Sequence, residues 1–290
     1  MIVDLEDVVK RYGSSTAVAG VSFQVACGET VALLGPNGAG KTTTLDIALG
    51  LRRANSGRAT LFGKDPRDLA VRRRLGATPQ QSGMPASLRV REIAQFVASH
   101  FPRPAGIDET LSAFGLLELT RRQTGGLSGG ELRRLGLALA FIGNPEFVVL
   151  DEPTTGLDLE SRHRTWAYVR AYVANGGTVL FTTHHMEEAE ALASRILVID
   201  RGKVTFDAAP GEIRQRYGVR RLQYVGDPFD PRAYGIECTV EASNGCVRVT
   251  ASDTDALVRS MVTHGIPFKN LQIENASLEE ALESAVGGER

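Results

Sequence analysis

The sequence predicts an α/β fold with a mixed sheet core and a helical subdomain, followed by a small C-terminal α+β unit. Strand and helix patterns alternate in the middle of the chain, which is typical of a parallel sheet flanked by helices. An apolar strand pattern at Thr30–Leu34 runs directly into a glycine-rich turn and then into a helix pattern at 42–50. The composition changes after Tyr217, so we expect domains at residues 1–217 and 218–290.

The apolar spacing predicts the elements of the first domain in order. Short strands are expected at Val3–Val9 and Ser22–Val25. The pattern from about 80 to 143 is helical and predicts the helical subdomain. Its expected helices are Val90–Ser99, Asp108–Phe114 and Gly130–Ile142. The alternating elements that follow are a strand at Phe147–Leu150, a helix containing Trp166, Val169 and Val173, a strand at Val179–Thr182, a helix at Met186–Ala193 and a strand at Ile196–Ile199.

The second domain contains a strong hairpin signal, the Asn-Gly pair at 244–245. Counting outward from this turn places Glu241 opposite Arg248, which is a favourable cross-strand pair. The same register puts Cys238 on the apolar face and Cys246 on the polar face, so we expect no disulfide between them. The other elements expected here are a helix near Asp253–His264, a strand around Leu271–Ile273 and a last helix near Leu278–Ala285.

Composition limits the classes of function. Hydrophobic residues make up 42% of the chain, which is enough for a substantial core. Lys+Arg (33) and Asp+Glu (34) nearly cancel, so no global field indicates a nucleic-acid partner. No apolar run approaches the roughly 20 residues that span a bilayer, and the acidic N-terminus does not resemble a signal peptide. We therefore expect a cytoplasmic chain whose membrane role, if it has one, depends on a partner.

The glycine-rich turn carries the first chemical motif, a phosphate-binding loop between strand and helix. Its residues are Gly35, Pro36, Asn37, Gly38, Ala39, Gly40, Lys41 and Thr42. The glycines let successive backbone N–H groups turn inward to form an anion nest. Lys41 adds a positive charge for the β- and γ-phosphates, and the Thr42 hydroxyl is a suitable Mg²⁺ ligand. The chain has no Asn-Lys-x-Asp motif for reading guanine, which favours ATP over GTP.

A second anion-binding element lies far downstream, in the signature segment Leu127–Glu131 (LSGGE). Apolar residues recur at helical spacing after it, so Ser128 is expected to cap a helix whose first residues, Gly129 and Gly130, leave the backbone N–H groups uncovered. Asp151 and Glu152 follow an apolar strand, and adjacent strand residues point to opposite sides, so the two carboxylates are expected to have different roles. Two phosphate-binding elements on one chain suggest that each serves a different end of a nucleotide.

Over about its first 215 residues, the chain with these motifs resembles the ATP-binding cassette (ABC) ATPases, which are P-loop NTPases. The resemblance implies that Asp151 holds Mg²⁺ through its water shell and that Glu152 polarises the attacking water. It implies that His184 is the switch histidine contacting the γ-phosphate, although His185 is adjacent. It also implies that Gln80 reaches Mg²⁺ and the water, with neighbouring Gln81 as the alternative.

Three further binding residues follow from the same resemblance. Tyr12 matches the position of an aromatic residue that stacks on adenine, with an edge-strand tyrosine as the competing interpretation. Thr43 belongs to the nucleotide-binding set beside Thr42. Asp158, in Gly156-Leu157-Asp158, matches the D-loop and would touch the opposing subunit.

The resemblance also implies the partners. Two copies would pair head to tail, with each ATP held between the phosphate loop of one copy and Ser128–Gly130 of the other. A separately encoded membrane permease would use the cycle for export of a small molecule or lipid, with this chain peripheral on the cytoplasmic face. The segment Asn275–Glu280 resembles the acidic-leucine tail of the exporter branch, which implies export. The alternative is a soluble ABC-type ATPase that remodels nucleic acid or a protein assembly. The C-terminal unit is expected to stabilise the dimer or regulate it.

Overall fold

The computed structural model of this 290-residue chain describes every residue except 79–82, 218–219, 235–237, 244, 252, 276 and 288–290. The chain divides into two compact units, Met1–Ala208 and Ala209–Arg290. Helix α8 (Pro210–Tyr217) contacts α10 (Leu278–Gly287) inside the second unit, so the compact units divide before α8. The domain boundary after Tyr217 remains a prediction.

A six-stranded sheet forms the centre of the first unit. Its order is β5 (Leu75–Thr78), β6 (Phe147–Asp151), β7 (Thr178–Thr182), β3 (Thr30–Leu34), β8 (Arg195–Asp200) and β9 (Lys203–Ala208). The first five strands are parallel, and β9 pairs antiparallel with β8. Every residue of β3, β6 and β7 is buried, as expected for strands covered on both faces. The mixed sheet core predicted from the sequence is confirmed.

A second sheet is antiparallel, in the order β2 (Ser15–Val25), β1 (Val3–Tyr12) and β4 (Ser56–Leu61). It contacts helix α1 (Lys41–Ala48), and the two share a core with the inner face of the central sheet. The strands β1 and β2 are longer than the sequence predicted. Register shifts along their pairing interrupt the apolar alternation, so only the regular portions were recognisable in the sequence.

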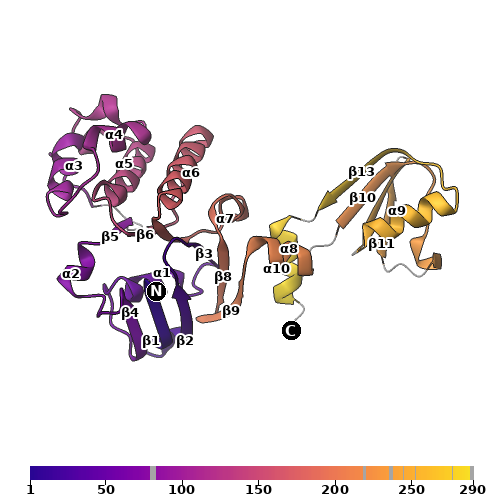
Figure 1. Ribbon diagram of the computed structural model, residues 1–290, viewed down its shortest axis with the longest axis horizontal. Coiled ribbons are helices and arrows are strands. Elements are labelled where there is room, and N and C mark those ends of the chain that lie inside the picture. Colours follow the sequence, from indigo (N-terminus) through magenta and orange to yellow (C-terminus); the bar gives the residue numbers. More distant parts are fainter. Residues whose placement is uncertain are drawn as a thin grey trace. The chain divides into compact units, whose positions relative to one another are not determined.

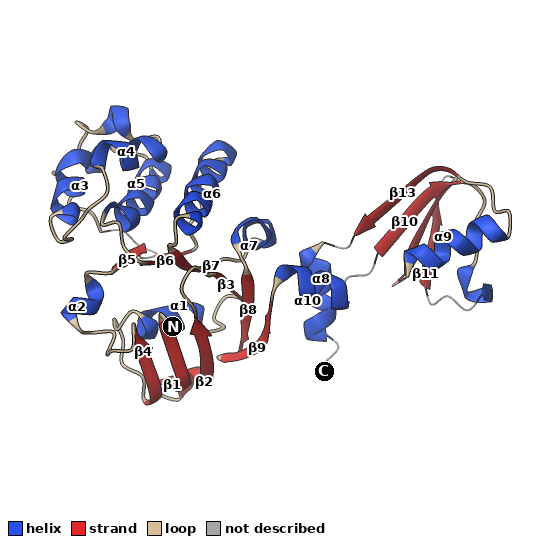
Figure 2. Ribbon diagram, viewed as in Figure 1, coloured by secondary structure: helices blue, strands red, loops and turns tan. Residues whose placement is uncertain are grey.

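The helices between β5 and β6 lie together, apart from the β1–β2–β4 sheet (Figures 1 and 2). They are α3 (Val90–Ala98), α4 (Ile107–Ala113) and α5 (Gly129–Ile142), with short 3₁₀ turns at Leu117–Leu119 and Thr124–Gly126. Two short helices, α2 (Leu69–Arg72) and α7 (Met186–Leu192), complete the unit together with α6 (Leu159–Ala174). The Phe114 and Phe141 rings of the helical group pack against Tyr168 of α6, at centroid distances of 4.8 and 5.0 Å.

The second unit contains a four-stranded antiparallel sheet with one face covered by α9 (Thr254–Thr263). Its order is β11 (Cys238–Ser243), β12 (Cys246–Ala251), β10 (Arg220–Val225) and β13 (Lys269–Asn275), with a 3₁₀ turn at Pro231–Tyr234. Glu241 pairs with Arg248 in the hairpin, as predicted, and all three cysteines are free. Within the described part of the chain, no helix combines the length and apolar character needed to cross a membrane.

Candidate functional site

The order of the central sheet brings the sequence motifs to one edge. Strand β7 lies between β6 and β3, and all three are parallel. The residues that follow their carboxyl ends therefore share an edge of the sheet, where open α/β sheets place their ligand sites. The phosphate loop follows β3, Glu152 follows β6 and His184 follows β7 closely.

Two glycines of the phosphate loop are required by close backbone approaches. Gly35 has φ 147°, and a Cβ built there would lie 2.1 Å from the Ile199 carbonyl oxygen. Gly40 has φ 105°, and a Cβ there would lie 2.3 Å from the Ala17 carbonyl oxygen. Since neither position accepts a side chain, the loop can pack tightly against β8 and β2 only with glycine. This packing fixes the loop in front of α1.

Lys41, the first residue of α1, is folded back over the loop. Its Nζ donates hydrogen bonds to the carbonyl oxygens of Gly35 (2.7 Å) and Pro36 (3.0 Å). Burial lowers the pKa of Lys41 below its usual range, while the charges of Glu152 and Asp151 act in the opposite direction. The ammonium group is thus held at the centre of an anion-binding loop.

A cavity of about 430 Å³ opens at the loop and brings together residues that are far apart in sequence. It is lined by Ala17, Asn37, Gly38, Gly40, Lys41, Thr42, Thr43 and Glu152. Two predicted features, the phosphate loop and Glu152, therefore face the same space. Ala17 was not predicted from the sequence. Its carbonyl approaches Gly40 only in the folded chain, and no local sequence motif indicates that contact.

Asp151 and Thr42 form a pair of oxygen donors suited to Mg²⁺. The Thr42 Oγ1 and Asp151 Oδ2 atoms lie 3.4 Å apart, and the Thr182 hydroxyl donates to the other carboxylate oxygen. The Asp151 backbone N–H donates to Thr78 Oγ1 at 3.3 Å, which ties the end of β6 to the end of β5. Mg²⁺ needs only one or two protein ligands where phosphate oxygens and waters supply the others. Thr78 and Thr182 are supporting residues that the sequence analysis did not identify.

Glu152, which lines the cavity, contacts His184, which is not among the lining residues. His184 Nδ1 is 3.3 Å from Glu152 Oε1, whereas His185 is the N-cap residue of α7. The strand alternation expected for Asp151 and Glu152 does not describe the structure. Strand β6 ends at Asp151, and Glu152 has φ 49°, in the left-handed region. The two carboxylates diverge because the backbone turns at Glu152, and not because a strand continues through both.

The signature segment lies at the start of α5 and forms a capping box. Ser128 Oγ accepts from the Glu131 N–H at 3.2 Å, and the Glu131 carboxylate accepts from the Ser128 N–H at 2.6 Å. This second bond is the main cause of a lowered pKa at Glu131. Gly129 and Gly130 are the first residues of the helix, and a Cβ at Gly129 would contact nothing within 4 Å. Within the described part of the chain, the phosphate-loop cavity is lined without any residue of the signature segment.

The remaining predicted residues are more dispersed. Asp158 caps α6 by accepting from the Ser161 N–H (2.7 Å), a bond that lowers the pKa of Asp158. Tyr12 ends β1 and is 43% exposed, and the Arg52 Cζ atom lies 5.7 Å from its ring centroid. The exposed ring leaves area for stacking, although Tyr12 is not in the lining of the phosphate-loop cavity. Gln80 and Gln81 both lie outside the described residues.

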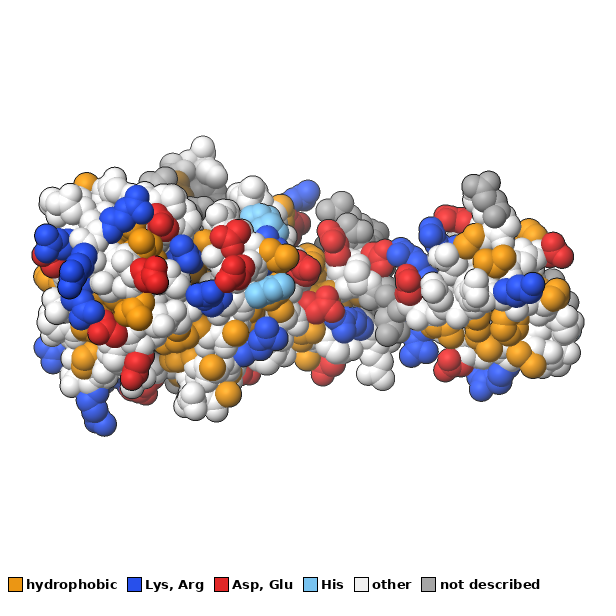
Figure 3. Space-filling view, turned by 90° about the horizontal axis from the view of Figure 1, so that it is seen from above, with side chains coloured by type: hydrophobic (Ala, Val, Ile, Leu, Met, Phe, Trp, Pro, Cys, Tyr) orange, Lys and Arg blue, Asp and Glu red, His pale blue; other side chains and the backbone are white. Residues whose placement is uncertain are grey.

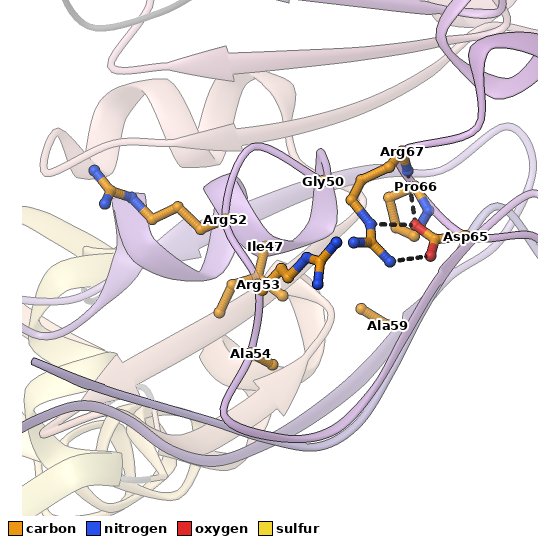
Figure 4. Close-up of a pocket in the computed structure, with 9 residues that line it drawn as sticks. All are labelled: Ile47, Gly50, Arg52, Arg53, Ala54, Ala59, Asp65, Pro66 and Arg67. Carbon is orange, nitrogen blue, oxygen red and sulfur yellow. Dashed lines mark hydrogen bonds and ion pairs between the residues drawn. The ribbon is translucent and has the colours of Figure 1, made fainter.

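A second cavity, of about 200 Å³, lies past the C-terminal end of α1. Figure 4 shows the guanidinium groups of Arg53 and Arg67 directed toward one another, whereas Arg52 points away. Asp65 accepts two side-chain hydrogen bonds from Arg67, so part of the positive charge is neutralised within the cavity wall. This cavity contains none of the residues predicted from the motifs.

The chain was compared with known protein families and curated proteins. Residues 18–155 match the family model described as ABC transporter. The chain is 43% identical over 251 residues to Nod factor export ATP-binding protein I of Burkholderia orbicola (strain AU 1054), covering 83% of this chain and 82% of that protein. It is 38% identical over 300 residues to daunorubicin resistance ATP-binding protein DrrA2 of Streptomyces coeruleorubidus, covering 96% and 92%.

Solved structures give the same fold. One is the ATP-binding subunit of an ABC transporter, with a TM-score of 0.69, 24% identity, and coverage of 75% of this chain and 93% of that chain. Another is a dimeric, post-hydrolysis ATP-binding cassette bound to ADP and Pi, with a TM-score of 0.66, 24% identity, and coverage of 72% and 98%. At this level of identity the likeness concerns the fold alone.

Proposed function

Because the chain belongs to the ABC transporter family, we propose that it is the ATP-hydrolysing subunit of an exporter whose membrane permease is a separate chain. The relatives named above are ATP-binding proteins of export or drug-resistance systems. The chain binds ATP with Mg²⁺ and hydrolyses it. The finer statements, that it works as a homodimer and docks on a permease, are part of the proposal.

One observation carries the proposal. The phosphate loop, Glu152 and His184 are gathered at one sheet edge, while the capped start of α5 presents its own N–H groups elsewhere. A helix N-terminus of this kind favours an anion. Two phosphate-binding elements that do not share a cavity in one chain can act on one nucleotide if two copies face each other. ATP then joins the copies, and its cleavage removes the shared ligand.

Each residue contributes through position and charge. The loop N–H groups and Lys41 would bind the phosphates. Thr42 and Asp151 would hold Mg²⁺, which would supply positive charge to neutralise the phosphates. Glu152 orients the attacking water and accepts its proton, and His184 holds the Glu152 carboxylate in place. Asp158 and Ser128–Gly130 complete the site from the second copy. Tyr12 would stack on the adenine. For Gln80, which lies outside the described residues, a contact with Mg²⁺ and the water stays a prediction.

The charge distribution supports a protein or membrane-protein partner over nucleic acid. Acidic and basic side chains are interspersed on the visible face of each unit in Figure 3, in keeping with the near-zero net charge of −1. A nucleic-acid binder would concentrate basic residues on one surface.

The test is co-purification of the full-length tagged chain from its own cells, with the membrane and soluble fractions analysed separately. We expect the chain in the membrane fraction together with an integral membrane protein, and transport of the cargo lost when Glu152→Gln replaces the native chain. Recovery only from the soluble fraction with nucleic acid or a soluble assembly would instead support the remodelling ATPase.

A further inference from the structure

Arg133 connects the signature helix to the end of strand β6. It lies in α5, shortly after Ser128, and its guanidinium donates to the carbonyl oxygens of Asp151 and Glu152. Its Nε also donates to the Pro153 carbonyl oxygen, at 3.3 Å. One side chain thus bonds three successive carbonyls of the strand-end segment, Asp151–Pro153. The planar fork of arginine, with its fixed donors, suits such a set, whereas a lysine has only one nitrogen.

To make these bonds, the Arg133 guanidinium group is partly buried and loses contacts with water. Burial lowers the pKa of Arg133, and the carboxylates of Asp151, Glu152 and Glu188 oppose that effect. Glu188 is fully buried in α7, where its Oε1 accepts from Trp166 Nε1 at 3.2 Å. A partly desolvated cation is retained in a protein when hydrogen bonds and opposite charges compensate it. Here such compensation comes from the Asp151–Pro153 carbonyls, from the carboxylates of Asp151 and Glu152, and from Glu188 in the helix that follows His184.

The strand-end segment needs to be held, because Glu152 has a backbone conformation that non-glycine residues rarely adopt. At φ 49° the residue is in the left-handed region, which persists only where surrounding contacts enforce it. On one side the Glu152 N–H donates to Thr182 Oγ1 at 2.9 Å. On the other side Arg133 donates to the Glu152 carbonyl. The two peptide groups of Glu152 are therefore held from opposite elements, and their orientation directs the carboxylate toward His184.

We propose that Arg133 is a positioning residue that makes the orientation of Glu152 depend on the position of the signature helix. This inference rests on the proposed homodimer. There, Ser128 contacts the ATP held by the partner's phosphate loop, while Glu152 of the same chain serves the other ATP. Movement of α5 on closure of one site is passed through Arg133 to the carboxylate of the second site. The two ATP sites of the dimer are thereby coupled.

The test compares Arg133→Met and Arg133→Lys in the full-length chain. For Arg133→Met we expect kcat to fall about 10- to 100-fold, because a misplaced general base loses part of its contribution to the rate. The affinity for ATP should stay within about twofold of the wild type. The Hill coefficient for ATP should fall from above one to about one. Arg133→Lys should retain the charge and recover only part of kcat. Should Arg133→Met fail to fold, as shown by thermal unfolding, the lysine variant carries the same test.

A double-mutant cycle with Glu152→Gln separates positioning from a general structural role. If Arg133 acts through Glu152, adding Arg133→Met to Glu152→Gln should lower single-turnover hydrolysis by no more than about twofold. The same 10- to 100-fold loss in both backgrounds would overturn the proposal, as would a wild-type Hill coefficient of one. Failure of the proposed function is a distinct result, in which Glu152→Gln itself hydrolyses ATP normally.

Arg134 offers a matched control. It is the next residue on α5 and donates to the Phe114 and Gly115 carbonyl oxygens, both at 3.4 Å, within the helical group. Arg134→Met also removes an arginine-to-carbonyl contact from the same helix, but it leaves the strand-end segment untouched. We expect its kcat to remain within about twofold of the wild type. A loss equal to that of Arg133→Met would show that the effect belongs to the helix as a whole and would contradict the proposal.

Discussion

The phosphate-loop region and the start of α5 both suit an anion, but they are built differently. In the first, Lys41 is bonded to the loop, Asp151 to Thr182, and Glu152 to His184, so the groups are positioned within one chain. At the start of α5, Ser128 and Gly129 are exposed, and Ser128 forms the two hydrogen bonds of its own helix cap with Glu131. Each copy thus positions its own phosphate-binding and catalytic groups, whereas the start of α5 faces outward, where a second copy could reach it.

The largest effect should come from the prearranged region. We expect Glu152→Gln to lower ATP turnover about 10²- to 10⁴-fold, because the amide cannot accept the proton of the attacking water. ATP binding should be nearly intact, so the variant should accumulate as an ATP-bound dimer. Steady-state hydrolysis and light scattering with and without ATP measure these two outcomes.

Glu160→Gln is the control for that change, since Glu160 is exposed on α6 and forms an i,i+4 ion pair with Arg164. Its turnover should stay within about twofold of the wild type. Wild-type turnover in Glu152→Gln would show that Glu152 is not the general base. It would also contradict the view that the phosphate-loop region holds the catalytic groups of each copy.

A smaller effect should come from the outward-facing region. Ser128→Ala removes the cap of α5 and should cost about 1 kcal/mol of folding stability. It also removes a hydroxyl proposed to contact the ATP bound by the partner. We expect kcat/KM to fall about tenfold, because this is roughly the effect of losing one hydrogen bond to a charged group. Thermal unfolding and hydrolysis kinetics on the same samples measure the two losses.

Asp253→Ala provides the comparison, because Asp253 caps α9 in the second unit by accepting from the Ala256 N–H at 2.8 Å. It should lose a similar amount of stability, about 1 kcal/mol, while hydrolysis stays unchanged. Equal kinetic losses in the two variants would mean that the Ser128 effect reflects helix stability and not contact with a nucleotide.

The elements that the sequence predicted are those whose signal is local. The apolar run Thr30–Leu34 and the cap at Ser128 lie where expected, because continuous burial and cap chemistry are both visible over a few residues. Strands β4 and β5 were not predicted, since half of β4 is exposed and β5 has only four residues.

The parts of the site that were missed depend on contacts across long stretches of chain. Thr78 reaches Asp151 and Arg133 reaches Asp151–Pro153 only after the sheet and α5 have packed. The turn at Glu152 was also missed, because a left-handed φ at a non-glycine residue is imposed by neighbours such as Thr182 and not by its own preference. The reacting groups lie in local sequence motifs, whereas the groups that hold them come from distant parts of the chain.

Mixing two inactive copies tests most directly whether the two regions serve one nucleotide across a dimer. One copy carries Lys41→Met in the phosphate loop. The other carries Gly129→Asp, which places a negative charge where a Cβ meets nothing within 4 Å. In a mixed dimer, one site has both defects and the other has neither. We predict that each variant alone is inactive and that the mixture recovers up to roughly a quarter of wild-type hydrolysis, because about half of randomly formed dimers are mixed. No recovery, with mixed dimers shown to form, would contradict the account.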